Sequence, residues 1–413
     1  MKLKLRLTLM SFLQYAIWGS WLISLGAYLG GGLHFSGFQI GSFFATMGIA
    51  SLFMPAIMGI IADRWIPAQK VLGICHILAA AFLIAAAPQT QYGTLYPLVL
   101  LSVMFYMPTI ALSNSVAYNA LSLNGYDTVK AFPPIRVWGT VGFICAMILV
   151  DLLGFATTYY QFYLSAGLGL ILGIYSFTLP NCEVNKNVEK KSLVDSLGLR
   201  AFTLFKERKM AVFFIFAMLL GMSLQITNAY ANDYLTNYFG KISEYQGTFG
   251  VKHANILISL SQISETLCIL LIPFFLSRFG IKKVMLISMF AWVLRFGLLG
   301  LGNPGSGVWM LILSMIVYGV AFDFFNISGS LFVENETDAK IRSSAQGVFM
   351  IMTNGFGAFI GSYIAGLVVD ATDWPDPWFV FSAYSLVVAI VFAFVFKYKH
   401  NPKNSSTVSK AAQ

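Results

Sequence analysis

The sequence predicts an all-α membrane protein with twelve transmembrane helices in two halves of six. Three observations support this fold class: the composition, the series of long apolar runs and a weak repeat between the two halves. Of the 413 residues, 58% are hydrophobic and only 10% are charged. This balance is too apolar for a soluble globular chain and is typical of a chain that crosses a membrane many times.

Apolar runs long enough to cross a bilayer follow one another along the chain. A helix needs about 20 such residues to span the hydrocarbon core. The predicted spans cover 7–29, 38–62, 71–88, 94–118, 135–157, 159–179, 210–232, 253–277, 283–301, 307–331, 343–369 and 377–396. The first run is longer than the apolar part of a signal peptide, so we expect an uncleaved first helix.

The distribution of basic residues predicts that both termini lie in the cytoplasm. With the N-terminus inside, nearly all of the 26 Lys and Arg residues fall in inner segments, and only Lys241 and Lys252 fall in outer loops. Basic residues resist translocation and collect on the cytoplasmic side. The net charge of +9 therefore reflects the topology. The basic residues on the cytoplasmic side have affinity for anionic headgroups, and the charge does not indicate nucleic-acid binding.

The longest predicted inner segment divides the spans into two groups of six. We therefore expect an N-terminal bundle, a cytoplasmic linker loop, a C-terminal bundle and a cytoplasmic tail, over 1–179, 180–209, 210–397 and 398–413. The end of the linker, SLGLRAFTLFK, is expected to form a short amphipathic helix on the membrane surface.

The two halves also echo one another in sequence. Tyr106 and Asn114 recur as Tyr318 and Asn326, and two further weak matches also place equivalent spans six apart. Because six is even, the repeats share an orientation and are related by an axis along the membrane normal. This organisation resembles that of major facilitator transporters, whose site lies at the midplane between the halves.

The segment GIIADRW (59–65) resembles a charge latch on the cytoplasmic face of that superfamily. Gly59, Asp63 and Arg64 match its Gly-x-x-x-Asp-Arg pattern, although the second Gly and the following basic residues are incomplete. We expect these three residues to form a cytoplasmic gating motif.

Two carboxylates lie inside predicted spans. Glu265 and Asp323 each stand alone as a charged residue in a long apolar stretch. A carboxylate at the centre of a bilayer-length helix costs about 2.5–3.5 kcal/mol on insertion scales, so such residues usually face a polar pathway or a partner. We expect both acids to serve in proton coupling. A structural ion pair, for example with Arg136, is the alternative.

Further polar residues share helix faces, since residues three or four apart lie on one side of a helix. They include Gln225 with Asn228, Gln262 with Glu265, Arg136 with Thr140 and Phe143, Tyr318 with Phe322, and Gln14 with Trp18. Together these side chains are expected to line a cavity, where amides and carboxylates bind sugar hydroxyls and aromatic rings stack on a nucleobase. The spans contain only Arg136 and Arg295 as cations, so a phosphorylated substrate is not expected.

Several longer strings make the resemblance specific: MSFLQYAIWGSWLISLGAYL, MPTIALSNSVAY, FPPIRVWGTVGF, LQITN, SQISETL and MIVYGVAFDFFNISGSLFVE. They are similar to the bacterial nucleoside:proton symporter family of the major facilitator superfamily, over about residues 1–400. The resemblance implies uptake of nucleosides across the inner membrane, driven by inward proton flow. It also implies substrate contacts from Arg136, Thr140, Phe143, Gln225, Asn228, Gln262, Glu265, Tyr318, Phe322 and Asp323. Members of the family prefer different nucleosides, including xanthosine, and the preference of this chain stays open.

We therefore expect a monomeric, proton-coupled symporter in the lipid bilayer that imports purine or pyrimidine nucleosides without a cofactor. A sugar:proton symporter of the same fold is the alternative. A nucleoside receptor is less consistent with the sequence because we expect no appended soluble domain that would pass on its signal, and an uncoupled facilitator is less consistent with two central carboxylates. The chain has no GxSxG, HExxH or P-loop sequence, so it is not expected to be an enzyme.

The remaining charged and titratable residues are expected to be structural. Arg295 and Asp151 lie near span ends, where snorkelling or a structural pair is the simpler interpretation. The four histidines are expected in loops or at span ends, without the spacing of metal ligands: His34, His76, His253 and His400.

Overall fold

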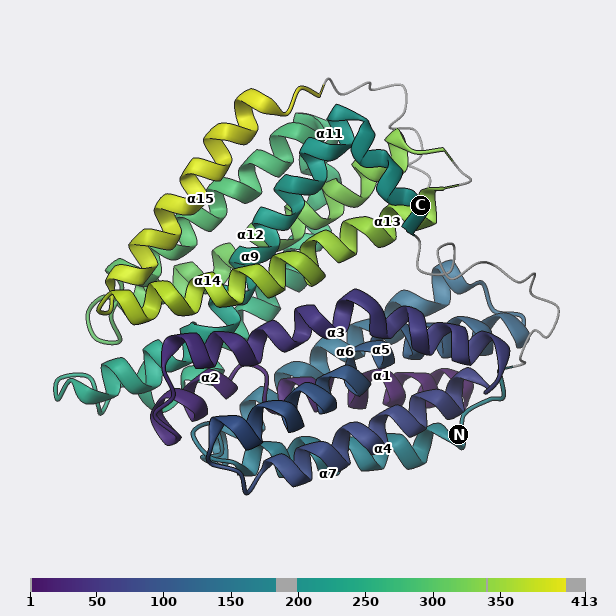
Figure 1. The fold of residues 1–413 in the computed structure, drawn as a ribbon, viewed down its shortest axis with the longest axis horizontal. Coiled ribbons are helices and arrows are strands. Elements are labelled where there is room, and N and C mark those ends of the chain that lie inside the picture. Colours follow the sequence, from purple (N-terminus) through teal and green to yellow (C-terminus); the bar gives the residue numbers. More distant parts are fainter. Residues whose placement is uncertain (1, 183–198, 339–340, 399–413) are drawn as a thin grey trace.

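The computed structural model describes residues 2–182, 199–338 and 341–398. Within these ranges the chain is helical and contains no β-strand. A helix satisfies its backbone N–H and C=O groups within one segment, which a chain in hydrocarbon requires. Figure 1 shows the helices in two groups, the earlier part of the chain below and the later part above.

The first group, called the N-terminal group below, consists of helices joined by short loops. Its elements are α1 (Leu3–Gly19), α2 (Leu25–Ala27), η1 (Tyr28–Gly32), α3 (Gly37–Arg64), α4 (Ala68–Ala86), α5 (Tyr92–Leu123), α6 (Thr128–Leu152) and α7 (Tyr160–Ser176). Here α1 packs against α6 and α7, and α4 packs against α5 and α7.

The second group, called the C-terminal group, follows the linker. Its elements are η2 (Leu199–Lys206), α9 (Arg208–Asp233), η3 (Tyr234–Tyr238), η4 (Phe239–Lys241), α10 (Phe249–Lys252), α11 (Ala254–Leu301), α12 (Val308–Glu336), α13 (Arg342–Met350), η5 (Ile351–Gly357), α14 (Ala358–Ala371) and α15 (Asp376–Val395). The long helix α11 packs against α12 and α15, and α9 packs against η5 and α14.

Nine helices in the described ranges are long and apolar enough to cross a membrane. Two more apolar helices, α1 and α7, have 17 residues each. The 48-residue helix α11 contains two predicted spans, and its backbone is non-helical at Gly280, with φ 74°. Glycine adopts this left-handed φ without the steric cost that a Cβ brings, so the chain turns there between the two runs. These helices belong to a multi-pass membrane protein.

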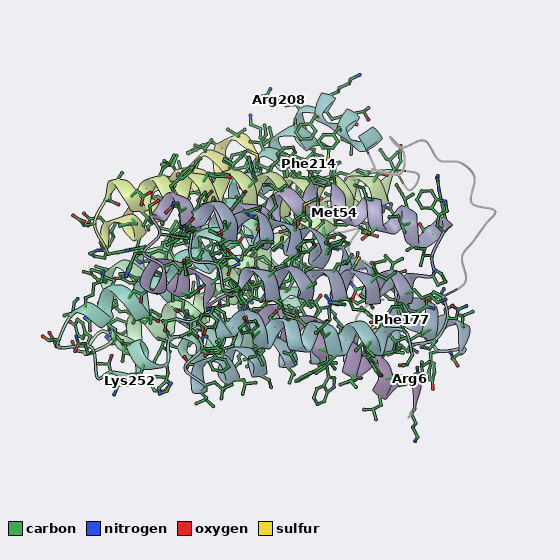
Figure 2. All side chains as sticks on the ribbon, turned by 60° about the horizontal axis from the view of Figure 1, so that its bottom comes forward. Arg6, Met54, Phe177, Arg208, Phe214 and Lys252 are labelled. Carbon is green, nitrogen blue, oxygen red and sulfur yellow. The ribbon has the colours of Figure 1, made fainter. Side chains whose placement is uncertain are left out.

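Large apolar side chains on the surface fit contact with lipid. Phe394 is 77% exposed and Leu270 is 74% exposed, a degree of exposure that water would penalise. Figure 2 shows Arg6 and Lys252 at opposite ends of the molecule, with Phe177 at the end that carries Arg6. The Arg6 guanidinium donates to the Thr178 carbonyl, which ties the N-terminus to the loop after α7.

The predicted surface helix in the linker takes a different form. Residues 199–206 form a 3₁₀ helix that packs against α9 and α13, and Leu204 is buried. The Phe202 and Phe205 rings stack at 5.8 Å, and Phe205 stacks on Phe214 of α9 at 5.2 Å. The apolar face of this segment is therefore occupied by the C-terminal group rather than by lipid; the start of the predicted stretch, 196–198, lies outside the described residues.

The two groups meet mainly through α3 with α14 and η5, through α2 with α9, and through α6 with α11. At the end opposite the N-terminus, Asp370 of α14 accepts hydrogen bonds from the backbone N–H groups of Gly37 (2.5 Å) and Phe38 (2.8 Å) at the start of α3. A Cβ on Gly41 would lie 2.2 Å from the Ser362 carbonyl oxygen, so the two helices touch through their backbones. We call this region the closed end.

At the other end, which carries the N-terminus, the two groups diverge in Figure 1. A Cβ on Gly59 of α3 or on Gly347 of α13 would meet no described atom within 4 Å. A Cβ on Gly48, nearer the middle of α3, would lie 2.6 Å from the Gly355 carbonyl oxygen. Among the described residues, the close contact between the groups therefore extends from the closed end to the middle of α3 and does not include Gly59 or Gly347.

Candidate functional site: a polar interface between α6, α11 and α12

Arg136 and Glu265 lie within electrostatic range of one another where α6 of the N-terminal group contacts α11 of the C-terminal group. The Arg136 guanidinium lies 4.0 Å from the centre of the Tyr15 ring, a cation–π contact. Glu265 is close enough for its charge to act on both Arg136 and Tyr15. Side chains from α1, α6 and α11 therefore form one electrostatic cluster across the interface.

Asp323 extends this cluster onto α12. Its side chain is only 5% exposed, and its Oδ2 atom has no hydrogen-bond partner in the described part of the chain. The charges of Asp323 and Glu265 act on one another across the contact between α11 and α12. Two like charges in a medium of low dielectric constant repel strongly, so a proton on either carboxyl relieves that repulsion.

Tyr318 and Phe322 form a stacked aromatic pair next to the carboxylates. Their ring centres are 5.7 Å apart and their planes differ by 4°. The Tyr318 hydroxyl lies near the Gln262 side chain, which lies one turn before Glu265 on α11. The structure therefore brings together six of the ten predicted substrate residues: Arg136, Gln262, Glu265, Tyr318, Phe322 and Asp323.

The other four predicted residues lie on α6 and α9. Thr140 and Phe143 follow Arg136 on α6 and are half-buried, as is Asn228 on α9. Gln225 is 7% exposed, and its Oε1 atom has no hydrogen-bond partner among the described residues. Within the described residues, no hydrogen bond, ion pair or ring stacking joins these four side chains to Glu265 and Asp323, which we call the carboxylate cluster.

Arg295 is a structural residue of the C-terminal group. It is 2% exposed, donates from Nη1 to the Ser314 carbonyl at 2.7 Å and lies 4.6 Å from the centre of the Tyr318 ring. The alternative that it snorkels to the surface is wrong, because these partners hold the guanidinium inside. The predicted structural pair is present, with a carbonyl and an aromatic ring as partners.

Asp151 also forms the predicted structural pair. Its Oδ2 atom lies 2.9 Å from Nδ1 of His253, at the start of α11. Asp151 belongs to α6 and His253 to the C-terminal group, so this contact also joins the two groups.

Sequence reasoning missed a polar cluster inside the N-terminal group. The prediction that Gln14 lines the cavity is wrong: it is fully buried, with its Nε2 donating to Thr109 Oγ1 (2.7 Å) and its Oε1 2.8 Å from His76 Nε2. His76 lies in the middle of α4 rather than in a loop or at a span end. Its position within the apolar run 71–88 was the signal that could have placed it.

The predicted gating motif lies at the end where the groups diverge. Gly59, Asp63 and Arg64 form the last turns of α3, with Asp63 exposed and Arg64 half-buried. In the described part of the chain, no group of three His, Cys, Asp or Glu residues could hold a metal ion. The four cysteines form no disulfide there, and Cys75 is one of the buried ones.

A helical membrane protein with charged residues buried where two helix groups meet belongs to the class of solute transporters. The model of the nucleoside H⁺ symporter family matches residues 1–401, and the chain belongs to this family. The predicted family and the predicted function, proton-coupled nucleoside import, are confirmed.

Individual relatives agree with this family. The chain is 51% identical to the xanthosine permease of Escherichia coli K12 over 410 residues, covering 98% of each chain. It is 50% identical to the nucleoside permease NupG of the same strain, covering 99% of this chain and all of the relative. These relatives are transporters, and the prediction that the chain is not an enzyme is confirmed.

Solved structures agree on the fold. A crystal structure of the nucleoside transporter NupG superposes with a TM-score of 0.91 at 50% identity, covering 97% of this chain and all of that one. A POT family transporter superposes with a TM-score of 0.72 at 15% identity, covering 95% and 96%, and this likeness shows the fold alone. The predicted major facilitator-like fold is thereby supported.

Proposed function

We propose that the protein carries nucleosides, purine or pyrimidine or both, into the bacterial cytoplasm together with protons. The observation that carries this proposal is the cluster of Glu265, Asp323 and Arg136 between the two helix groups, in a chain of the nucleoside H⁺ symporter family. A neutral nucleoside needs no fixed cation, and two acids inside the helix bundle, the half-buried Glu265 and the buried Asp323, supply sites for the coupling proton.

The proposed topology has twelve spans, with both termini in the cytoplasm and the chain acting as a monomer in the inner membrane. The N-terminal bundle (1–179) and the C-terminal bundle (210–397) form the two moving bodies, joined by the linker 180–209 and followed by the tail 398–413. In this orientation the closed end faces outward. The divergent end, with Gly59, Asp63 and Arg64, faces the cytoplasm, so the conformation is inward-open.

The proposed site combines the cluster with the neighbouring helices. The ribose hydroxyls are bound by Gln225, Asn228, Gln262 and Glu265, because an amide both donates and accepts hydrogen bonds and a carboxylate accepts them. Phe143 and Phe322 offer aromatic faces to the base, and Arg136, Thr140 and Tyr318 complete the wall. This set draws on both bundles, as an alternating-access site requires.

Alternating access couples the two fluxes. A proton on Glu265 or Asp323 removes one of two neighbouring negative charges, so the site closes around the nucleoside at lower electrostatic cost. One charge moving through a potential of about 100 mV gains about 2.3 kcal/mol, enough for roughly fifty-fold accumulation. The two bundles then rotate against one another, the site opens to the cytoplasm, and the nucleoside and the proton are released.

Uptake of labelled uridine and adenosine into proteoliposomes, with and without an inward proton gradient, tests this function. Uptake above equilibrium that a protonophore abolishes is the expected result. Uptake that only reaches equilibrium, with or without the proton gradient, would support the nucleoside as substrate and exclude proton coupling. If folded protein transported a disaccharide and no nucleoside, the substrate would be a sugar rather than a nucleoside.

A further inference from the structure

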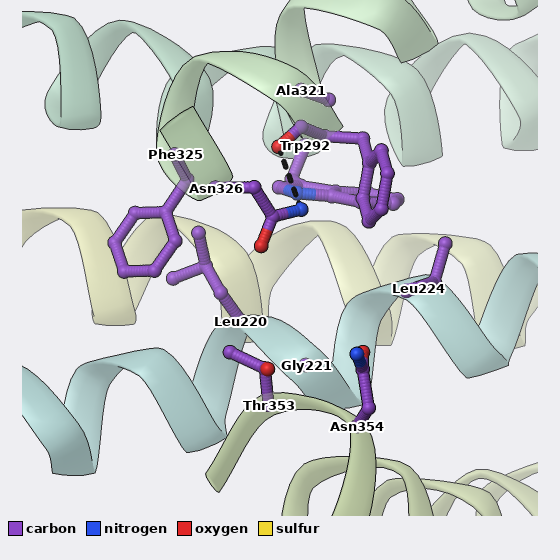
Figure 3. Close-up of a pocket in the computed structure, with 10 residues that line it drawn as sticks. Leu220, Gly221, Leu224, Trp292, Ala321, Phe325, Asn326, Thr353 and Asn354 are labelled. Atoms are coloured by element: carbon purple, nitrogen blue, oxygen red, sulfur yellow. Dashed lines mark hydrogen bonds between the residues drawn. The ribbon is translucent and has the colours of Figure 1, made fainter. Parts of the chain in front are cut away.

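A pocket in the C-terminal group lies next to the carboxylate cluster. It is an open recess between α9, α11, α12 and the π-helical turn η5, and about 280 Å³ of space, open solvent included, adjoins its walls (Figure 3). Its walls include Trp292 of α11, Phe322 and Asn326 of α12, and Thr353 and Asn354 of η5. We call it the amide pocket. Phe322 belongs both to this pocket and to the proposed site, so the two adjoin at this side chain.

Two asparagine side chains face this space from opposite walls. Asn326 donates from Nδ2 to the Phe322 carbonyl oxygen at 3.2 Å, and its Oδ1 atom points into the pocket (Figure 3). Asn354 points toward the same space from η5, and its Nδ2 atom makes only a weak contact with Met350 Sδ at 3.9 Å. Both residues are half-buried, so their amide groups remain accessible from the pocket.

The π-helical turn gives Asn354 this position. In η5 the wider turn shifts side chains relative to an α-helix, and such turns are frequent at functional sites. A Cβ on Gly221 of α9 would lie 2.2 Å from the Thr353 carbonyl oxygen, so η5 rests directly on the α9 backbone. Asn354 is therefore held by a rigid backbone contact at the pocket floor.

The remaining walls are flat and apolar. Phe322 is held by its stack on Tyr318, and Trp292 lies edge-on to Tyr318 with ring centres 6.1 Å apart. Leu224 of α9 covers another side of the pocket. A flat, mostly apolar space with two amides fits a planar ring whose edges carry hydrogen-bond donors and acceptors.

We propose that the amide pocket receives the nucleobase and that Asn326 and Asn354 select among bases. An amide offers both a donor and an acceptor, and Asn binds base edges through paired hydrogen bonds. Asp323 lies one turn before Asn326 on the same face of α12, so a base bound by Asn326 places the ribose toward Asp323 and Glu265. Both asparagines are neutral, so the preference among bases is separate from the proton chemistry. This inference rests on the proposed nucleoside transport.

The variants Asn326→Leu and Asn354→Leu remove the amides at similar volume, and Asn335→Leu on an exposed position of α12 is the matched control. Competition against labelled uridine by cytidine, adenosine, inosine and free ribose, in proteoliposomes, is the measurement. Each pocket variant is expected to change the relative affinities of the nucleosides about three- to ten-fold, the value of one hydrogen bond. Competition by ribose and the stoichiometry of protons to nucleoside should match the control.

The isosteric variants Asn326→Asp and Asn354→Asp provide a second test. This test remains usable if a Leu variant does not fold. A carboxylate only accepts hydrogen bonds, so these variants should favour cytidine and adenosine, whose bases carry an amino group, over uridine and inosine. If the folded Leu and Asp variants rank the nucleosides by affinity as the wild type does, and the wild type takes up nucleosides, the proposal that the amide pocket selects the base would be wrong. Nucleoside transport itself would still be supported. No nucleoside uptake by the wild type would overturn both.

Discussion

Glu265 and Asp323 occupy neighbouring helices but have different surroundings. Glu265 is half-buried at the contact between α6 and α11, where Arg136 lies, whereas Asp323 is buried, with an oxygen that lacks a partner among the described residues. Glu265 is therefore placed to respond when the two helix groups move against one another. Asp323 changes its environment only if the C-terminal group itself rearranges.

Replacing Glu265 by Gln should abolish accumulation while leaving nucleoside binding largely intact, because the amide keeps the shape but cannot release a proton. In proteoliposomes at about 100 mV, accumulation should fall from roughly fifty-fold to equilibrium. Counterflow, which needs no proton gradient, should persist. The exposed Glu244→Gln is the matched control, and full concentrative uptake by Glu265→Gln would exclude Glu265 as the coupling residue.

Arg295 shows how one residue can stabilise a site without contacting substrate. Its guanidinium donates a hydrogen bond to the Ser314 carbonyl and lies over the Tyr318 ring, which also stacks on Phe322. The Arg295→Met variant keeps much of the buried volume but leaves the Ser314 carbonyl without its donor. The loss should be about 1–3 kcal/mol of stability, seen as a lower melting temperature in detergent, and an unchanged melting temperature would contradict this role.

At the scale of elements, the closest helix contacts depend on residues without side chains. Without a hydrophobic driving force between helices in lipid, close van der Waals packing through small residues takes its place. Gly142 of α6 illustrates this: a Cβ there would lie 2.1 Å from the Phe12 carbonyl oxygen of α1. The same helix carries Arg136, so the position of that side chain depends on this backbone contact.

The variant Gly142→Ala should therefore force α1 and α6 apart, at a cost of about 1–3 kcal/mol. Thermal stability in detergent should fall, and uptake should fall with it because Arg136 moves relative to Glu265. Gly167→Ala on α7 is the control, since a Cβ there would meet no described atom within 4 Å. Equal melting temperatures for the two variants would show that the α1–α6 contact tolerates a methyl group.

At the scale of the whole molecule, the closed end depends on a cap shared by the two groups. A carboxylate that accepts backbone hydrogen bonds at a helix N-terminus stabilises it, and here Asp370 of one group caps α3 of the other. The cap is lost whenever the groups separate at this end. Asp370 therefore biases the equilibrium toward the conformation observed.

Replacing Asp370 by Ala should shift the protein toward opening at this end by about 0.5–2 kcal/mol, or roughly 2- to 30-fold. A cysteine at Ser362, which is fully buried at the closed end, reports this shift through its rate of labelling by a maleimide. The rate should rise with Asp370→Ala and remain unchanged with Asp373→Ala in the nearby loop. Equal rates in the two backgrounds would show that the cap does not control opening.

The sequence by itself determined the class of protein, the family and the residue types of the site. Glu265 and Asp323 stand out because a charge in an apolar run is costly, and one sequence is enough to reveal that cost. The strings around Arg136 and Asp323 identified the family, which the comparison with its model confirms. Helix periodicity also indicated which residues share a face, and the pairing of Tyr318 with Phe322 is a contact within one helix.

Only the tertiary structure decided which helix lies opposite each face. In a helix that is apolar on nearly all sides, the position of a polar residue does not reveal whether it faces the cavity or a neighbouring helix. Gln14, for example, forms hydrogen bonds with Thr109 and His76 within its own bundle. The π-helical turn that positions Asn354 departs from the period on which the sequence argument relies. The closed end, where Asp370 caps α3, joins residues more than 300 positions apart in the chain, and their proximity is decided by packing between the two groups.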